Sequence, residues 1–133
     1  MKKLILLILV VVAVIGFGKY LKREDKNIVV VGREYILTNS GETPITIGFD
    51  AEKFYGFSGI NRYFGTYTIE GKKIKFSHPG MTMMAGPQEL MLKEQEYMKK
   101  LETVNEFELR GKKLILGSNG KNILKYKEAV LAN

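Results

Sequence analysis

The segment KIKFSHPGMTMMAGPQELMLKEQEYMKKLETV, residues 73 to 104, decides the fold because its hydrophobic period changes along its length. Residues 73 to 77 alternate polar and apolar side chains, which is typical of a half-buried β-strand. Residues 87 to 104 follow a helical period, and Pro87 suits the first helical position. The apolar stripe of this helix comprises Leu90, Tyr97, Leu101 and Val104, with Met91 and Met98 beside it. The segment predicts a strand followed by an amphipathic helix that packs one face on a sheet.

Short segments with alternating side chains lie on both sides of residues 73 to 104. Strands are predicted at residues 33–38, 44–49, 53–59 and 64–71 before the helix, and within 107–118 and 121–128 after it. Gly, Asn, Ser and Pro separate them, so the strands are expected to be antiparallel neighbours. The predicted fold class is α+β, a twisted antiparallel sheet resembling a half-barrel, with one main helix packed on it.

Two predicted hairpins share one pattern. The sequence YTIEGKKIKF at residues 67–76 aligns with FELRGKKLIL at residues 107–116. Aromatic or aliphatic residues occupy equivalent positions in both, and both have Gly-Lys-Lys at the turn. Two copies do not make a repeat protein. The similarity predicts two equivalent hairpins in one sheet, placed before and after the helix.

The N-terminus differs in composition from the rest of the chain. An uninterrupted apolar run at residues 4–18 is about 22 Å long as a helix, somewhat less than the ~30 Å hydrocarbon core of a bilayer. It can span if Lys3 and Lys19 snorkel, or it can be the core of a signal peptide cleaved after Gly18. We therefore predict a signal anchor or signal peptide at residues 1–26 and a single domain at 27–133. The domain is expected to be membrane-anchored on the extracytoplasmic side or, after cleavage, secreted or periplasmic.

Net charge and cysteine content exclude several classes of function. The formal charge is +7, and residues 1–26 supply four of these charges, so the basic bias indicates lipid headgroups near the apolar run and not nucleic acid. The chain has no cysteine. Disulfides, thiolate metal sites, a cysteine nucleophile and a lipid-accepting cysteine are therefore excluded.

The sequence offers little for catalysis. His78 is the only histidine and lies in a predicted loop, while Ser58 is outside a nucleophile-elbow pattern. Phosphate-loop and dinucleotide-binding patterns are missing. The carboxylates considered for acid-base work occupy positions typical of turns and helix surfaces; they are Asp50, Glu52, Glu70, Glu89, Glu94 and Glu96. We expect a protein that is not an enzyme and has no cofactor.

The methionine-rich stretch at residues 78–87 allows two interpretations. Thioethers are soft ligands, so His78 with Met81, Met83 and Met84 is a candidate Cu(I) site. Methionine also fills irregular gaps between a helix and a sheet, and this stretch lies at such a junction. Packing is the interpretation that the residue pattern favours.

Three linked motifs resemble the META domain family, which includes HslJ-like heat-inducible envelope lipoproteins. They are GINRYFGTY at residues 59–67, TMMAG at residues 82–86, and Glu94, Tyr97 and Leu101 at the family's helix spacing. The similarity extends over roughly residues 32–127. Ile60 and Gly86 stand at the family's two cysteine positions, which suggests that these two residues are neighbours in the fold. Tyr35 stands in for an early tryptophan.

The resemblance implies a small envelope or secreted binding module connected with stress, without an established catalytic reaction. The matched positions that are candidate binding residues are Asn61, Tyr63, Thr82 and Met84. The structural alternative is that Asn61 and Thr82 bond loop backbone while Tyr63 and Met84 pack under the helix. The protein or small-ligand partner stays open. An inhibitor or partner-capture module would instead need an apolar patch on the concave side of the sheet.

Overall fold

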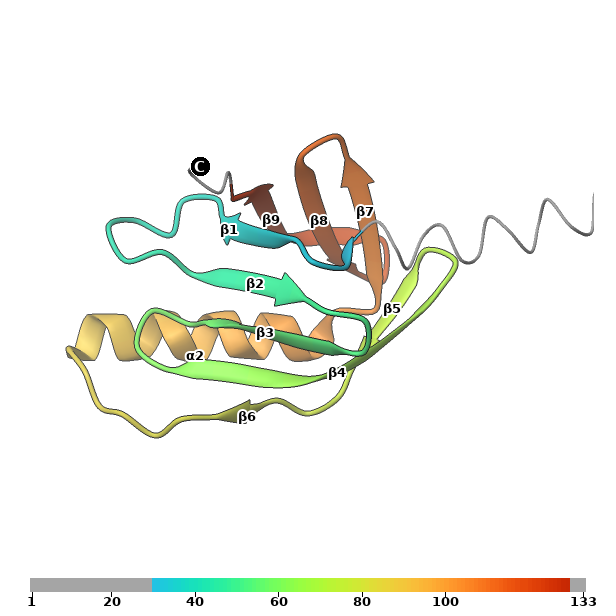
Figure 1. Cartoon of the computed structure of the whole chain (residues 1–133). Helices are drawn as coiled ribbons and strands as arrows, with labels where there is room; N and C mark the ends of the chain where they lie inside the picture. Colours follow the sequence, from blue (N-terminus) through green and yellow to red (C-terminus); the bar gives the residue numbers. More distant parts are fainter. Residues whose placement is uncertain (1–29, 130–133) are drawn as a thin grey trace, which may run out of the picture.

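The computed structural model describes residues 30–129 (Figure 1). The predicted membrane or signal segment at residues 4–18 lies outside this range, as does the predicted boundary after residue 26. Within residues 30–129, no helix is long and apolar enough to cross a membrane.

Nine strands and one main helix, α2, form the described part of the chain. The strands before the helix are β1 (Glu34–Leu37), β2 (Thr46–Phe49), β3 (Lys53–Phe57), β4 (Arg62–Glu70), β5 (Lys73–Phe76) and β6 (Gly80–Met81). Then follow α2 (Gln88–Thr103), β7 (Glu106–Arg110), β8 (Lys113–Ser118) and β9 (Lys121–Glu128). The α+β class, the antiparallel sheet and the single main helix are confirmed.

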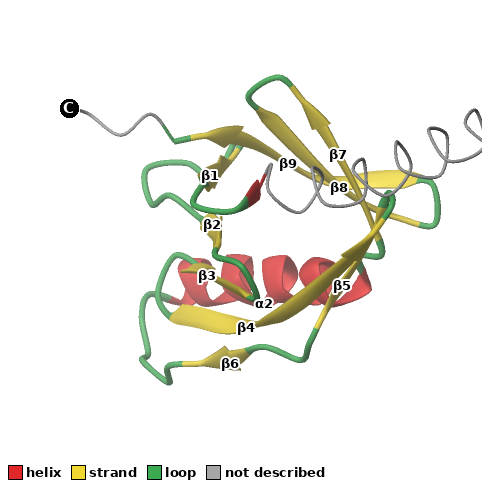
Figure 2. Ribbon diagram, turned by 45° about the vertical axis from the view of Figure 1, so that its right-hand side comes forward, coloured by secondary structure: helices red, strands yellow, loops and turns green. Residues whose placement is uncertain are grey.

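The sheet curls further than the predicted half-barrel. Its strand order is β3-β2-β1-β9-β8-β7-β5-β4-β6, and β3 also pairs with β4. That additional pairing joins the two sides of the sheet, so the ring of strand pairs closes and β6 is left at a free edge. The junction of β5 and β7 is narrow, with Lys73 opposite Glu106 as its one register pair. Figure 2 shows the strands curving around α2.

The two hairpins predicted from their shared pattern have the same register. Tyr67 pairs with Phe76 in the first, and Phe107 pairs with Leu116 in the second. Gly71 and Gly111 open the two turns with φ of 62° and 59°. A positive φ at the first turn residue is the geometry of a type II′ turn, which glycine adopts without strain. The shared Gly-Lys-Lys thus encodes the same turn twice.

The helix α2 begins one residue later than predicted, with Pro87 as its N-cap. Its apolar face buries Tyr97, Met98 and Leu101 against the sheet, while the predicted flanking Met91 is exposed. The missed element is β6, because the methionine-rich stretch was expected to be a loop and contains a two-residue strand that pairs with β4. A two-residue strand leaves too short a pattern to detect from sequence.

Three buried tyrosines connect α2 to opposite parts of the sheet. The hydroxyl of Tyr97 on α2 lies 2.7 Å from that of Tyr63 on β4 and 2.8 Å from that of Tyr126 on β9. Tyr63 donates onward to the carbonyl of Thr46 on β2. Burial raises the pKa of Tyr97 to about 12 and raises the pKa of Tyr63 and of Tyr126 well above the ordinary value. The three hydroxyls are therefore protonated at neutral pH in the folded protein.

The tyrosine chain makes stability depend on alkaline pH. Because the folded pKa values lie above the unfolded value of 10, this contribution is complete below pH 10 and is lost as the pH rises through the folded values. The slope is up to about 1.4 kcal/mol per pH unit for each tyrosine. Urea unfolding of the full chain between pH 8 and 11.5 measures it.

The variant Tyr97→Phe should lower the free energy of unfolding at pH 8 by about 1 to 2 kcal/mol, since it leaves Tyr126 without its bonded partner. It should also flatten the alkaline slope. Tyr55→Phe is the matched control for the change at pH 8, because the Tyr55 hydroxyl bonds Glu34 on the surface at 3.4 Å. Equal slopes in the wild type and in Tyr97→Phe would show that the buried chain does not titrate as described.

Candidate functional site

Asn61 joins the turn between β3 and β4 to the segment that follows β6. Its side-chain oxygen accepts from the Met84 N–H at 2.7 Å and from the Thr82 hydroxyl at 3.0 Å. Its side-chain nitrogen donates to the Met84 carbonyl at 3.1 Å. Asn61 is only 4% exposed. The Asn61 carboxamide therefore bonds Met84 as the backbone of a neighbouring strand would. It donates to the Met84 carbonyl and accepts from the Met84 N–H.

Glu94 on α2 completes this junction from the helix side. Its carboxylate accepts from the Asn61 side-chain nitrogen at 3.1 Å and from the Asn61 backbone N–H at 3.2 Å. The hydroxyl of Ser58, a fully buried residue, also donates to Glu94. Three segments distant in sequence thus meet at the Asn61 side chain: the β3–β4 turn, the segment after β6, and α2. We call Ser58, Asn61, Thr82 and Glu94 the polar junction.

The sequence interpretation of Glu94 as a surface carboxylate was wrong. Glu94 is half-buried and lies four residues after Leu90 and three before Tyr97, which places it on the apolar stripe of α2. A single charged residue within an apolar stripe is a signal that it faces a polar group in the core. Ser58, set aside as a nucleophile, is likewise bonded within the junction.

The four predicted binding residues do not form one cluster of side chains. Asn61 and Thr82 belong to the polar junction. Asn61 bonds the loop backbone of Met84, as the structural alternative held, whereas Thr82 accepts from the N–H of Arg62 in strand β4. Tyr63 is buried in the tyrosine chain under α2. Met84 contributes its backbone to the junction, while its side chain is 67% exposed.

The prediction that the methionine-rich stretch packs between helix and sheet was wrong for two of its three methionines. The exposed fraction is 94% for Met83, whereas Met81 is half-buried against the core. The physical reason is the polar junction, which holds the segment by its backbone and frees these side chains to face solvent.

The backbone of this segment alternates between bonded and unbonded groups. Thr82 donates its N–H to the Arg62 carbonyl at 3.0 Å, and Met84 is bonded through both backbone groups to Asn61. Within residues 30–129, no partner bonds the backbone N–H or carbonyl of Met83 or Ala85. In extended chain, successive residues point these groups to opposite sides. The groups of Met83 and Ala85 are therefore left without a partner, within the described part of the chain, in the segment that follows the edge strand β6.

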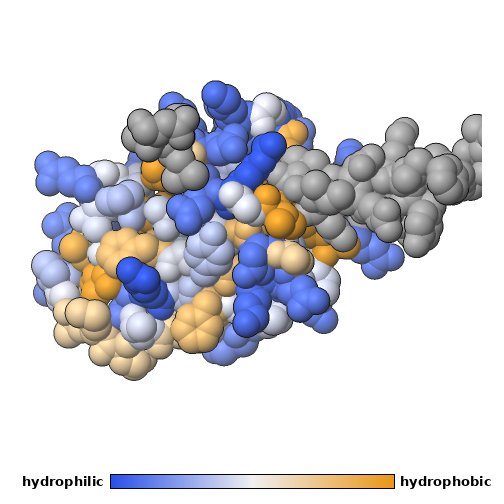
Figure 3. Space-filling model, viewed as in Figure 1, coloured by the Kyte–Doolittle hydropathy of each residue, from blue (hydrophilic) through white to orange (hydrophobic). Residues whose placement is uncertain are grey.

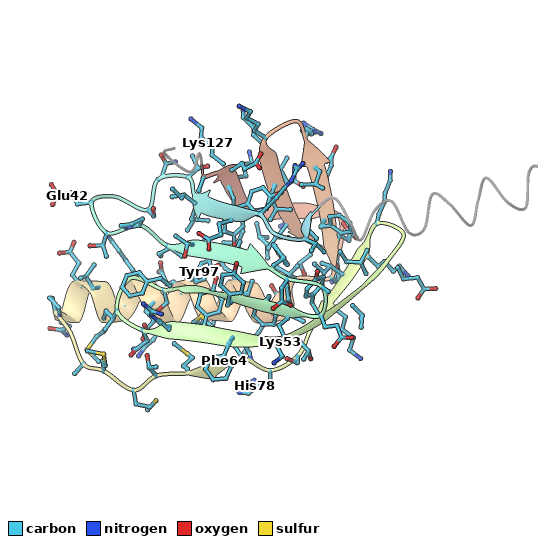
Figure 4. All side chains as sticks on the ribbon, viewed as in Figure 1. Glu42, Lys53, Phe64, His78, Tyr97 and Lys127 are labelled. Atoms are coloured by element: carbon cyan, nitrogen blue, oxygen red, sulfur yellow. The ribbon has the colours of Figure 1, made fainter. Side chains whose placement is uncertain are left out.

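Exposed aromatic side chains lie beside this edge on the outer face of the sheet. Phe64 on β4 is 57% exposed and faces Tyr55 across the β3–β4 pair. The Phe64 ring lies over Gly80, where an added Cβ would be 2.8 Å from it. Figure 4 shows Phe64 at the margin of the molecule near β6, and Figure 3 shows apolar atoms gathered over this region. The apolar patch lies on the convex side, whereas a capture module was expected to carry it on the concave side.

Ile60 and Gly86 are neighbours, as the family resemblance suggested. A Cβ placed on Gly86 would lie 3.0 Å from Cδ1 of Ile60 and 3.2 Å from its Cγ1. The Ile60 side chain therefore fills the space that a side chain at position 86 would need. The two segments of the polar junction are in contact here without a covalent link.

His78 is exposed and lies before β6, while Met83 and Met84 follow it. Its Nδ1 is 3.2 Å from a carboxylate oxygen of Glu102 on α2. In the described range, no three His, Cys, Asp or Glu side chains are grouped so that they could hold a metal ion. The Cu(I) site of His78, Met81, Met83 and Met84 stays a prediction, which copper titration tests.

Comparison with known proteins agrees with the motifs. The family model of the META domain matches residues 27–130. The chain belongs to the META domain family. None of the curated proteins compared with it matches.

Two solved structures share the fold of this META domain. An NMR structure of a protein from Burkholderia xenovorans is 20% identical, with a TM-score of 0.65, covering 79% of this chain and 87% of that chain. A second protein solved by NMR is 17% identical, with a TM-score of 0.60, covering 76% of this chain and 92% of that one. At this identity the likeness concerns the fold alone.

Removing the Asn61 carboxamide should destabilise the domain strongly. Asn61→Ala leaves both backbone groups of Met84 and the proton of the Thr82 hydroxyl without their acceptor or donor, which we expect to cost about 3 kcal/mol. The melting temperature of the full chain should fall by more than about 10 °C. Asn122→Ala is the matched control at an exposed asparagine and should change stability by less than about 0.5 kcal/mol. Equal melting temperatures for both variants would contradict the structural role of Asn61.

The contact between Ile60 and Gly86 predicts that a disulfide fits there. In the double variant Ile60→Cys and Gly86→Cys, mild oxidation should close a loop that stabilises the domain by about 3 kcal/mol over the reduced form. Mass spectrometry detects the bond, and thermal unfolding with and without reductant measures its effect. Each single cysteine variant is a control. Failure of the double variant to oxidise would place the two segments further apart than described.

Proposed function

We propose that this META domain is an exported, non-enzymatic binding module that pairs with an extended apolar segment of a partner protein along residues 81–85. The observation that carries the proposal is the combination of unbonded backbone groups at Met83 and Ala85 with exposed apolar side chains around them. A partner strand gains affinity from such backbone groups and specificity from the adjacent side chains.

The rigidity of this edge supports the proposal. The polar junction fixes residues 82 and 84 from the inner side, so the outer groups of residues 83 and 85 are already placed for a partner. Pre-placed groups lose less conformational entropy on binding than a mobile loop does. Exposed methionines suit partners of varied shape because their side chains are flexible and polarizable.

The proposal has three further aspects, which are the location of the protein, its non-enzymatic role and a connection with stress. The apolar run at residues 4–18 supports a location at the outer side of a membrane, as an anchored or a released protein. A non-enzymatic role is supported by the environment of Ser58 and Glu94, whose polar atoms are occupied within the polar junction. The family's connection with stress is the remaining part of the proposal, and it rests on resemblance alone.

Crosslinking in intact cells tests the location of the partner site. A photoreactive phenylalanine analogue placed at Met83 should capture a discrete partner, which mass spectrometry identifies. The same analogue at Met91, an exposed methionine on α2, is the matched control and should not capture that partner. The same capture from both positions would contradict a site along residues 81–85.

Affinity measurements with the captured partner test the strand pairing itself. Met83→Pro removes the outward N–H without altering the groups held by Asn61, and we expect it to weaken binding about tenfold or more. Met83→Ser should weaken binding through the lost apolar contact. Met91→Ser with Leu92→Ser removes similar exposed side chains from α2 and should leave the affinity unchanged. Wild-type affinity in Met83→Pro would exclude pairing at this edge.

A further inference from the structure

A cavity of about 430 Å³ opens between α2, the segment after β1 and the strand β9. Its floor includes Ile45, Tyr97 and Leu124, all buried. The hydroxyl of Tyr97 is held by Tyr63 and Tyr126, so the ring that forms the floor has a fixed position. The volume lies within the range of about 300 to 1,000 Å³ that small-ligand sites occupy.

Lysines surround the opening of this cavity. Lys93 and Lys100 come from one face of α2, seven residues apart with Tyr97 between them, and Lys125 comes from β9. Glu96 is the single acidic residue among the lining. None of the three lysines forms an ion pair with another residue in the range 30–129. The rim therefore carries an excess of two positive charges above an apolar floor.

We infer that this cavity binds a small organic anion with an apolar body, namely a carboxylate on a medium-length hydrocarbon chain. The chain lies on Ile45, Tyr97 and Leu124, and the carboxylate lies among Lys93, Lys100 and Lys125. Charge-assisted hydrogen bonds to the ammonium groups hold the head, while burial of the chain supplies the hydrophobic part of the affinity. No lining residue belongs to the segment 78–87, so this site is independent of the proposed partner edge.

Calorimetric titration of octanoate into the full chain in phosphatidylcholine nanodiscs tests the inference, with titration into empty nanodiscs subtracted. We expect saturable binding of one octanoate per chain. Octanamide has the same chain length without the charge, and it should bind about tenfold more weakly or worse.

Two lysine variants locate the site. Lys93→Gln with Lys100→Gln should weaken octanoate binding about tenfold. Lys112→Gln with Lys113→Gln makes the same change of charge in the β7–β8 hairpin, outside the lining, and should leave binding unchanged. The inference is overturned if octanoate does not saturate, if both pairs of substitutions have the same effect, or if octanamide binds as tightly as octanoate.

Discussion

The hydrogen bonds of Asn61 are the interaction on which the arrangement of the surface depends. One buried carboxamide joins the β3–β4 turn to the segment after β6, and Glu94 joins both to α2. An asparagine suits this place because its side chain carries both a donor and an acceptor, as a peptide group does. Without that pairing, Thr82 would still bond Arg62 on β4, but both backbone groups of Met84 would lose their partner and Met83 would be held on one side only.

The interior and the edge of the domain are thus specified by different means. Aromatic packing and the chain of three tyrosine hydroxyls fix α2 within the curled sheet. The polar junction then fixes one segment outside it through the backbone of Met84 and the hydroxyl of Thr82. This division explains how Met83 and Met84 can be exposed although they lie between the sheet and α2 in the sequence.

Much of the fold was predictable because it rests on local patterns. The alternating segments, the helical stripe of α2 and the repeated Gly-Lys-Lys turns each encode an element within a few residues. Closure of the sheet was not predictable, since the pairing of β3 with β4 depends on the three-dimensional curl of the sheet. The exposure of Met83 could not be predicted from the sequence either, because methionine occurs both in cores and on binding surfaces. The polar junction could have been detected from Glu94, because a charged residue on the apolar stripe of α2 indicates a polar partner in the core.

Hydrogen exchange of three neighbouring amides tests whether Asn61 holds the segment after β6. The Met84 N–H donates to Asn61, whereas the N–H groups of Met83 and Ala85 have no partner among the described residues. We predict slow exchange at Met84 and fast exchange at Met83 and Ala85, with the protection of Met84 lost in Asn61→Ala. Equal exchange rates at the three amides in the wild type, or protection of Met84 that persists in Asn61→Ala, would contradict this prediction.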